Sequence, residues 1–217
     1  MDIKLRKDAL DAYGKATQLI EGMFEVYQDF QKDKGKSFDV KDALVKFDVL
    51  LQFSMMQVAL ENNSLHIDEA KIIRDMSKYC DFCDYLNNNG FQNVTWQKVY
   101  DCKESSLQEI VTEHQDVMVK ANMELVAMLM LFKGTENGVE FFESLKQLVF
   151  VILASVSASD GNFDKAEVTQ QCLILQALAA AEQLAEEATG GKAEGEQSAE
   201  QPQGKKTSLK DFYVKKN

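Results

Sequence analysis

Three side chains that carry oxygen, Asp160, Asn162 and Asp164, occupy alternate positions in the stretch "VSASDGNFDKAEV". A third carboxylate, Glu167, follows three residues after Asp164. Carboxylate and amide oxygens presented by a tight turn are the ligands that hard cations such as Ca²⁺ and Mg²⁺ prefer in proteins. The stretch is therefore a candidate divalent-cation site, with Asp160, Asp164 and Glu167 as its metal ligands.

The same stretch also fits a corner between two helices. An EF-hand loop that began at Asp160 would need glycine at its sixth position and glutamate at its twelfth, where this chain has Lys165 and Gln171. The pattern is thus not that of an EF-hand. As a corner, Gly161 would end one helix in a left-handed turn, and Asp164 would cap the next with Glu167 three residues on.

A second, weaker copy of this corner lies in the stretch "VALENNSLHIDEAKI". After a small insertion, Glu61 lies opposite Asp160 and Asp68 lies opposite Asp164. Both corners follow an apolar helix, and both precede a helix that is expected to begin at an aspartate. The two copies predict an internally duplicated domain, and if the corners meet, their carboxylates could share one cation.

The elements that must position these corners are helices. Apolar residues recur at helical spacing, strand-like alternation is nearly absent, and the single proline, Pro202, lies near the end. The chain is therefore predicted to be all-α with about seven helices. They are expected over about residues 3–33, 37–61, 68–86, a short segment around 96–100, 105–132, 139–159 and 165–188.

The better corner completes a D-G-x-x-D-x-x-E pattern, through Asp160, Gly161, Asp164 and Glu167, directly after an apolar helix. With its weaker twin, this pattern resembles the TerB-like family, the all-helical tellurite-resistance and stress-associated domain, over roughly residues 40–185. The resemblance implies two helical halves, a non-enzymatic role and acidic residues that hold a metal ion.

The first corner departs from the family pattern. Asn62 stands where glycine is expected, and Lys71 stands where glutamate is expected. Carried over position by position, the family's metal ligands fall on Asp160, Asp164 and Glu167, with Glu61 and Asp68 as the weaker counterparts.

The pair Cys80 and Cys83 forms a C-x-x-C, and Cys102 follows nineteen positions after Cys83. These three thiolates with His114 would make a zinc ligand set, but a second C-x-x-C or a histidine pair is missing. Cysteines three apart on a helix are also common as small apolar core residues. No glycine-rich phosphate loop or nucleophile with an evident base occurs, so the chain is not expected to be an enzyme.

Composition narrows the partners and the compartment. A formal charge of −11 and a pI near 4.7 disfavour direct binding of nucleic acid or anionic membranes. The longest apolar run, residues 148–158, is shorter than the roughly 20 residues that span a bilayer. The start of the chain lacks the apolar core of a secretory signal. A cytoplasmic protein with reduced cysteines is expected.

The end of the chain differs in composition from the helical domain expected over residues 1–188. Residues 189–204 are rich in Gly, Glu, Gln and Ala, which predicts a disordered, flexible linker. Residues 205–217 predict a docking peptide, because Leu209, Phe212 and Tyr213 return among five lysines and one aspartate.

The segment "KTSLKDFY" resembles the PIP box, the peptide that binds sliding clamps, except that Lys206 replaces the usual glutamine. These features together predict a non-catalytic, cytoplasmic stress-response or adaptor module of the TerB-like type that docks a protein partner through Leu209, Phe212 and Tyr213. The alternative is an accessory protein of replication or repair that binds a sliding clamp.

Overall fold

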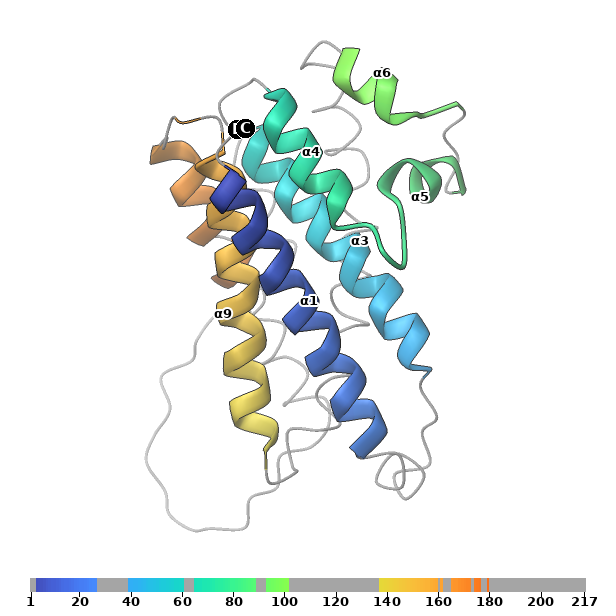
Figure 1. Ribbon diagram of the computed structural model, residues 1–217, viewed down its shortest axis with the longest axis vertical. Helices are drawn as coiled ribbons and strands as arrows, with labels where there is room; N and C mark the ends of the chain where they lie inside the picture. Colours follow the sequence, from blue (N-terminus) through green and yellow to red (C-terminus); the bar gives the residue numbers. More distant parts are fainter. Residues whose placement is uncertain are drawn as a thin grey trace, which may run out of the picture.

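The computed structural model describes residues 3–26, 39–60, 65–88, 93–101, 137–159, 161, 165–172, 174–176 and 179. Throughout these ranges the regular structure is helical and no strand occurs, so the predicted all-α class is confirmed. Residues 165–172 and 174–176 are helical. The labelled helices of Figure 1 are α1 (Ile3–Val26), α3 (Val40–Ala59), α4 (Ile67–Asp75), α5 (Phe82–Asn88), α6 (Trp96–Asp101) and α9 (Gly138–Ser157).

Helix α1 packs against α9 more extensively than any other two labelled helices pack against each other. In Figure 1 the start of α1 and the end of α9 lie at the same end of the bundle, so the two helices run antiparallel. The buried face of α1 carries alanine at positions 9, 12 and 16, and small side chains let helix axes approach closely. The first and last labelled helices are therefore joined along their length.

The aromatic residues of the core connect the remaining helices. Phe47 of α3 is stacked near Tyr13 of α1, with 6.4 Å between ring centroids. Phe53, further along α3, meets Phe82 and Tyr85 of α5 edge to face at 5.3 and 5.9 Å. Aromatic pairs at these separations contribute about 0.5–1.5 kcal/mol each beyond their burial.

The single helix predicted over residues 68–86 was wrong, because two helices, α4 and α5, occupy this range. Residues 77–81 between them are not helical, and Asp48 of α3 binds the backbone amides of Tyr79 and Cys80. Amides held by a carboxylate cannot donate to a helix carbonyl, so the chain leaves the helix there. The helix predicted at 105–132 lies outside the described residues, as does much of the one predicted at 165–188.

Helices α3 and α9 are related by a constant shift along the sequence. Both contain 20 residues, and they begin 98 positions apart, at Val40 and Gly138. Their C-caps, Leu60 and Ala158, have nearly the same backbone angles and donate to the carbonyls two and four residues earlier. The helix after the first corner begins at Ile67, and residue 165, at the same shift, is helical.

Burial follows the same shift. The buried positions of α9 correspond to buried positions of α3 except at Gly138 and Ser155, whose counterparts Val40 and Gln57 are half-buried. Equal length, equal cap geometry and a matching buried face identify a repeated helix–corner–helix unit without any insertion.

A search of the described helices for one long and apolar enough to cross a membrane found none.

Candidate functional site

The first corner begins helix α4 with a histidine. The Nδ1 atom of His66 accepts a hydrogen bond from the backbone N–H of Asp68 at 3.3 Å, and Glu69 Oε2 accepts one from the backbone N–H of His66 at 2.7 Å. This reciprocal arrangement is a capping box, which satisfies amides that the first turn of a helix leaves unpaired. The prediction that Asp68 caps this helix was therefore wrong, since Asp68 is its second residue.

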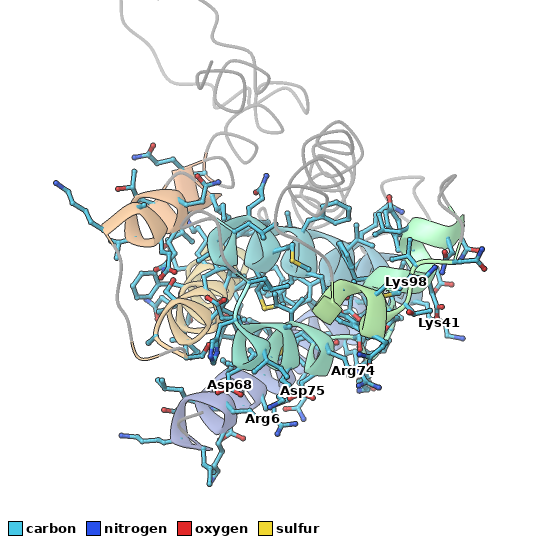
Figure 2. The ribbon with its side chains drawn as sticks, turned by 90° about the horizontal axis from the view of Figure 1, so that it is seen from above. Arg6, Lys41, Asp68, Arg74, Asp75 and Lys98 are labelled. Atoms are coloured by element: carbon cyan, nitrogen blue, oxygen red, sulfur yellow. The ribbon has the colours of Figure 1, made fainter. Side chains whose placement is uncertain are left out.

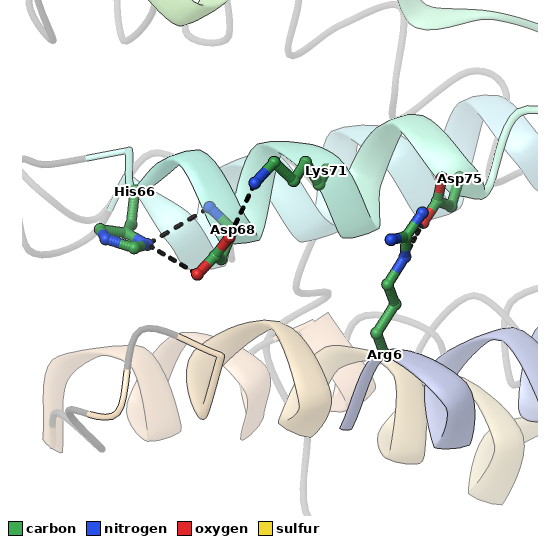
Figure 3. A network of polar contacts seen from close by, with 5 residues as sticks. All are labelled: Arg6, His66, Asp68, Lys71 and Asp75. Atoms are coloured by element: carbon green, nitrogen blue, oxygen red, sulfur yellow. Dashed lines mark hydrogen bonds and ion pairs between the residues drawn. The ribbon is translucent and has the colours of Figure 1, made fainter. Parts of the chain in front are cut away.

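Two aspartates of α4, Asp68 and Asp75, each form a separate ion pair with a basic side chain (Figures 2 and 3). Lys71 Nζ lies 3.1 Å from Asp68 Oδ1, and His66 Nδ1 lies 3.9 Å from Asp68 Oδ2. At the other end of α4, Arg6 Nε of α1 lies 2.6 Å from Asp75 Oδ2. This hydrogen bond is the main reason that the pKa of Arg6 is raised above its ordinary value.

The constant shift of 98 corrects the expected pairing of the two corners. Without any insertion, His66 corresponds to Asp164 and Glu69 corresponds to Glu167. The earlier pairing of Asp68 with Asp164 is thus displaced by two residues. The counterpart of Glu167 is therefore Glu69, which the sequence reasoning missed. Aligning the two copies without an insertion would have identified it.

Both of these glutamates are fully enclosed. Glu69 and Glu167 are each 0% exposed, although carboxylates are almost never fully buried unless they are paired. The second corner also buries Gln171, whose Nε2 donates to Ser157 Oγ at the end of α9. Each corner is therefore followed by a helix that buries a glutamate close to that corner.

The described residues do not by themselves form a cation site. Asp68 is already paired with the ammonium of Lys71, and Glu167 is enclosed at the second corner. Within the described ranges, no group of three or more His, Cys, Asp or Glu side chains is arranged to hold a metal ion. The other three candidate ligands, Glu61, Asp160 and Asp164, lie outside these ranges.

The most elaborate polar cluster was not found by sequence reasoning, and it centres on Asp48. This residue is 0% exposed and accepts hydrogen bonds from Tyr13 Oη at 2.7 Å, Tyr79 N at 2.7 Å and Cys80 N at 3.0 Å. Tyr13 Oη in turn accepts from the backbone N–H of Lys78 at 3.2 Å. The signal for it in the sequence was one aspartate within the apolar run "VKFDVLLQF".

Burial sets the protonation of this cluster. Desolvation raises the pKa of Asp48 to about 6, against the opposing effect of its hydrogen bonds from Tyr13, Tyr79 and Cys80. Desolvation likewise raises the pKa of Tyr13 far above its ordinary value, and the neighbouring Asp48 carboxylate adds to the shift. The cluster therefore holds the 77–81 segment on α1 and α3 and keeps its phenol protonated.

The C-x-x-C pair has the character of core residues. Burial raises the pKa of Cys80 to about 11 and that of Cys83 to about 12, and nearby aspartates strengthen both shifts. Cys83 belongs to the hydrophobic core. Cys102 and His114, the other members of the predicted zinc set, lie outside the described residues.

Asp81 organises the chain between the two cysteines and α6. Its Oδ1 accepts from the backbone amides of Cys83 and Asp84 at 2.8 and 3.3 Å, which caps the start of α5. Its Oδ2 accepts from Trp96 Nε1 at 2.7 Å. A single carboxylate thus ties α5 to α6.

The predicted linker at 189–204 and the docking peptide at 205–217, with Leu209, Phe212 and Tyr213, lie outside the described residues. Comparison of the chain with protein-family models, with curated proteins and with solved structures gave no match.

Proposed function

We propose that this protein is a non-catalytic, TerB-like adaptor of the stress-response type, which docks a protein partner through its C-terminal peptide. The observation that supports the TerB-like assignment is the repeated helix–corner–helix unit, in which Glu69 and Glu167 occupy equivalent, fully buried positions. The resemblance to the TerB-like family implies two helical halves of this kind.

The non-catalytic part of the proposal is supported by the state of the reactive groups. A thiol with a pKa near 11 or 12 carries little thiolate at neutral pH, and thiolate is the nucleophilic form. Asp48 and Tyr13 are buried and bound to one another. The hydrogen bond between Asp48 and Tyr13 joins α3 to α1, which is a structural role and not a catalytic one.

The docking peptide is tested with the full-length chain as bait. We expect wild-type protein to retain a partner in affinity capture, and the Leu209→Ala/Phe212→Ala variant to lose it, because these side chains would fill an apolar pocket. Ser208→Ala is the matched control, since it changes the same segment without removing an apolar anchor. Equal recovery by wild type and the double variant would contradict docking through this peptide.

The same variants distinguish the alternative function. Titration of the full chain against a purified sliding clamp would give saturable binding that depends on Leu209 and Phe212 if the protein is a clamp accessory. Capture of a different partner together with no clamp binding favours the adaptor.

Divalent-cation binding is a separate part of the proposal, and the cation would be Ca²⁺ or Mg²⁺ held by Asp160, Asp164 and Glu167. Calorimetric titration of the full chain should show heat that disappears in Asp160→Asn/Asp164→Asn. Asp8→Asn, an exposed position of α1, is the control. No heat at millimolar cation would exclude the metal while leaving peptide docking untouched.

A further inference from the structure

The two repeated helices differ in how much of their surface is covered. Helix α3 buries residues on every side, whereas α9 leaves one strip uncovered, which we call the outer face of α9. Phe150 and Val151 on this strip are 48% and 39% exposed. The outer face of α9 consists of Gln147, Phe150, Val151 and Ala154, and the corresponding positions of α3 are Val49, Gln52, Phe53 and Met56, all buried.

In the first half, a later segment of the same chain covers this strip. Phe53, the counterpart of Val151, has the rings of Phe82 and Tyr85 against it at 5.3 and 5.9 Å. Gln52, the counterpart of Phe150, donates through Nε2 to the Cys80 carbonyl at 2.6 Å. Figure 1 shows α5 beside α3, at the position from which it provides this cover.

The second half lacks the residues to repeat this cover. Shifted by 98, Phe82 and Tyr85 correspond to Ala180 and Gln183, which have no aromatic ring. From residue 164 to the end, the chain contains two aromatic residues, and both are in the docking peptide, at Phe212 and Tyr213.

We propose that the C-terminal peptide of this chain docks on the outer face of α9, with Phe212 and Tyr213 over Phe150 and Val151. The peptide would do for α9 what α5 does for α3. Its apolar residues would remove two exposed side chains of α9 from water, which favours association in proportion to the apolar area buried.

Charge agrees with this occupant. Residues 204–217 carry a local charge of +4, against −15 for the remainder of the chain. Glu140 and Glu143 are exposed on α9 before the apolar part of the outer face, and one oxygen of Glu143 already pairs with Lys146 Nζ at 2.6 Å. Glu143 precedes Phe150 by seven residues, about 10 Å along a helix, and an extended chain covers that distance in about three residues. Glu143 is thus within reach of Lys215 and Lys216, which lie two and three residues beyond Tyr213.

The chain between the helical bundle and the peptide is long enough. Residues 189–208, between the expected end of the last helix and Leu209, are 20 residues, and a flexible linker of that length has an end-to-end distance of roughly 25 Å. Helix α9, with 20 residues, is itself about 30 Å long. Linkers of this kind give effective concentrations on the order of 1 mM, so a peptide of only ~100 μM affinity would be docked about nine-tenths of the time.

The consequence is an autoinhibitory contact. While Phe212 and Tyr213 lie on α9, they are not available to an outside partner, so the outer face and the partner compete for the same side chains. Docking itself requires no outside partner, so it can be tested whether or not the proposed adaptor function holds.

The test is millisecond hydrogen exchange of the full chain, read by mass spectrometry of the fragment that contains residues 205–217. We expect the amides of this fragment to exchange about tenfold more slowly in wild type than in Phe150→Lys, and to be equally fast in Phe212→Ala/Tyr213→Ala. Leu10→Lys is the matched control, since Leu10 is 38% exposed on α1, and it should keep the wild-type slowing. Circular dichroism verifies that each variant is helical.

Three results would overturn the proposal. Exchange of the wild-type fragment at the rate of an unstructured peptide means that it does not dock. If amide exchange of the fragment is still slow in Phe150→Lys and also in Val151→Lys, a second variant of the outer face of α9, the peptide docks elsewhere. Slowing that disappears on dilution, together with a dimer in sedimentation, means that a second copy of the chain is the occupant. Loss of slowing in Phe150→Lys and Val151→Lys at every protein concentration supports docking within one chain.

Discussion

Replacement of Asp48 by alanine should unfold the junction between α3, α4 and α5 more readily than any change at the protein surface. Asp48 accepts from three donors, Tyr13 Oη and the amides of Tyr79 and Cys80, and its removal would leave them without that acceptor in buried or partly buried positions. At about 2 kcal/mol for each buried donor, the loss is about 6 kcal/mol.

Relief of the buried carboxylate opposes this loss. The pKa of Asp48 is about 6 in the folded protein against 3.8 in its reference state, a difference worth about 3 kcal/mol when the group is ionised. The net cost of Asp48→Ala at pH 7 is therefore about 3 kcal/mol.

The pH dependence follows from the raised pKa. The folded protein holds the Asp48 proton more tightly than the unfolded chain, so this group contributes its full stability below about pH 4. The contribution is lost as the pH rises through about 6. Because the wild type regains about 2 kcal/mol between pH 7 and pH 4, the cost of Asp48→Ala should increase to about 5 kcal/mol at pH 4.

Urea unfolding at the two pH values, followed by circular dichroism and by the fluorescence of the single tryptophan, Trp96, measures both costs. Asp48→Asn is the control, because its amide oxygen can accept from both backbone amides and it does not ionise. Loss of the hydrogen bond from the Tyr13 hydroxyl costs this variant about 2 kcal/mol, and removal of the buried charge offsets about 3 kcal/mol at pH 7. It should therefore be about 1 kcal/mol more stable than the wild type at pH 7 and about 1 kcal/mol less stable at pH 4. A cost of Asp48→Ala below about 1 kcal/mol at pH 7, or a cost that does not increase at pH 4, would refute this account.

Three further predictions concern other parts of the structure. Trp96→Phe should lower the free energy of unfolding by about 1–3 kcal/mol, because it removes the Nε1 donor to Asp81, and the loss should be much smaller when measured in an Asp81→Ala background. Glu69→Ala should cost roughly 1–2 kcal/mol through the capping box, whereas Glu69→Gln, which can still accept from His66, should keep most of the stability, as thermal melts would show. Alkylation of the native protein, mapped by mass spectrometry, should modify exposed Cys172 well before Cys80 and Cys83, and comparable rates at all three would contradict the raised thiol pKa values.

The sequence predicted the periodic elements well. Helical spacing of apolar residues placed α1, α3 and α9 nearly correctly, because a 3.6-residue pattern repeated over five or more turns is a strong local signal. The prediction failed between α4 and α5, where the apolar pattern continues but the backbone is not helical. The reason for that break, Asp48, lies more than 25 residues earlier in the chain.

The candidate site was predicted only in part. The two corners were found as a duplicated motif, yet the first was aligned with an insertion, since aspartate was assumed to be the capping residue. A histidine cap with a glutamate three residues later is a weaker sequence signal than an aspartate, and the exact 98-residue shift of α3 and α9 was needed to correct it.

The sequence by itself determined that this protein is all-α, where helices α1, α3 and α9 lie, and that a corner motif recurs along the chain, because these properties depend on the chemistry of neighbouring residues. The tertiary structure decided which polar groups are buried and which repeated surface stays uncovered. Asp48 becomes the acceptor for a distant turn, and Phe150 and Val151 stay exposed while their counterparts in α3 are covered. Burial depends on what the rest of the chain places against a residue, and no local pattern contains that information.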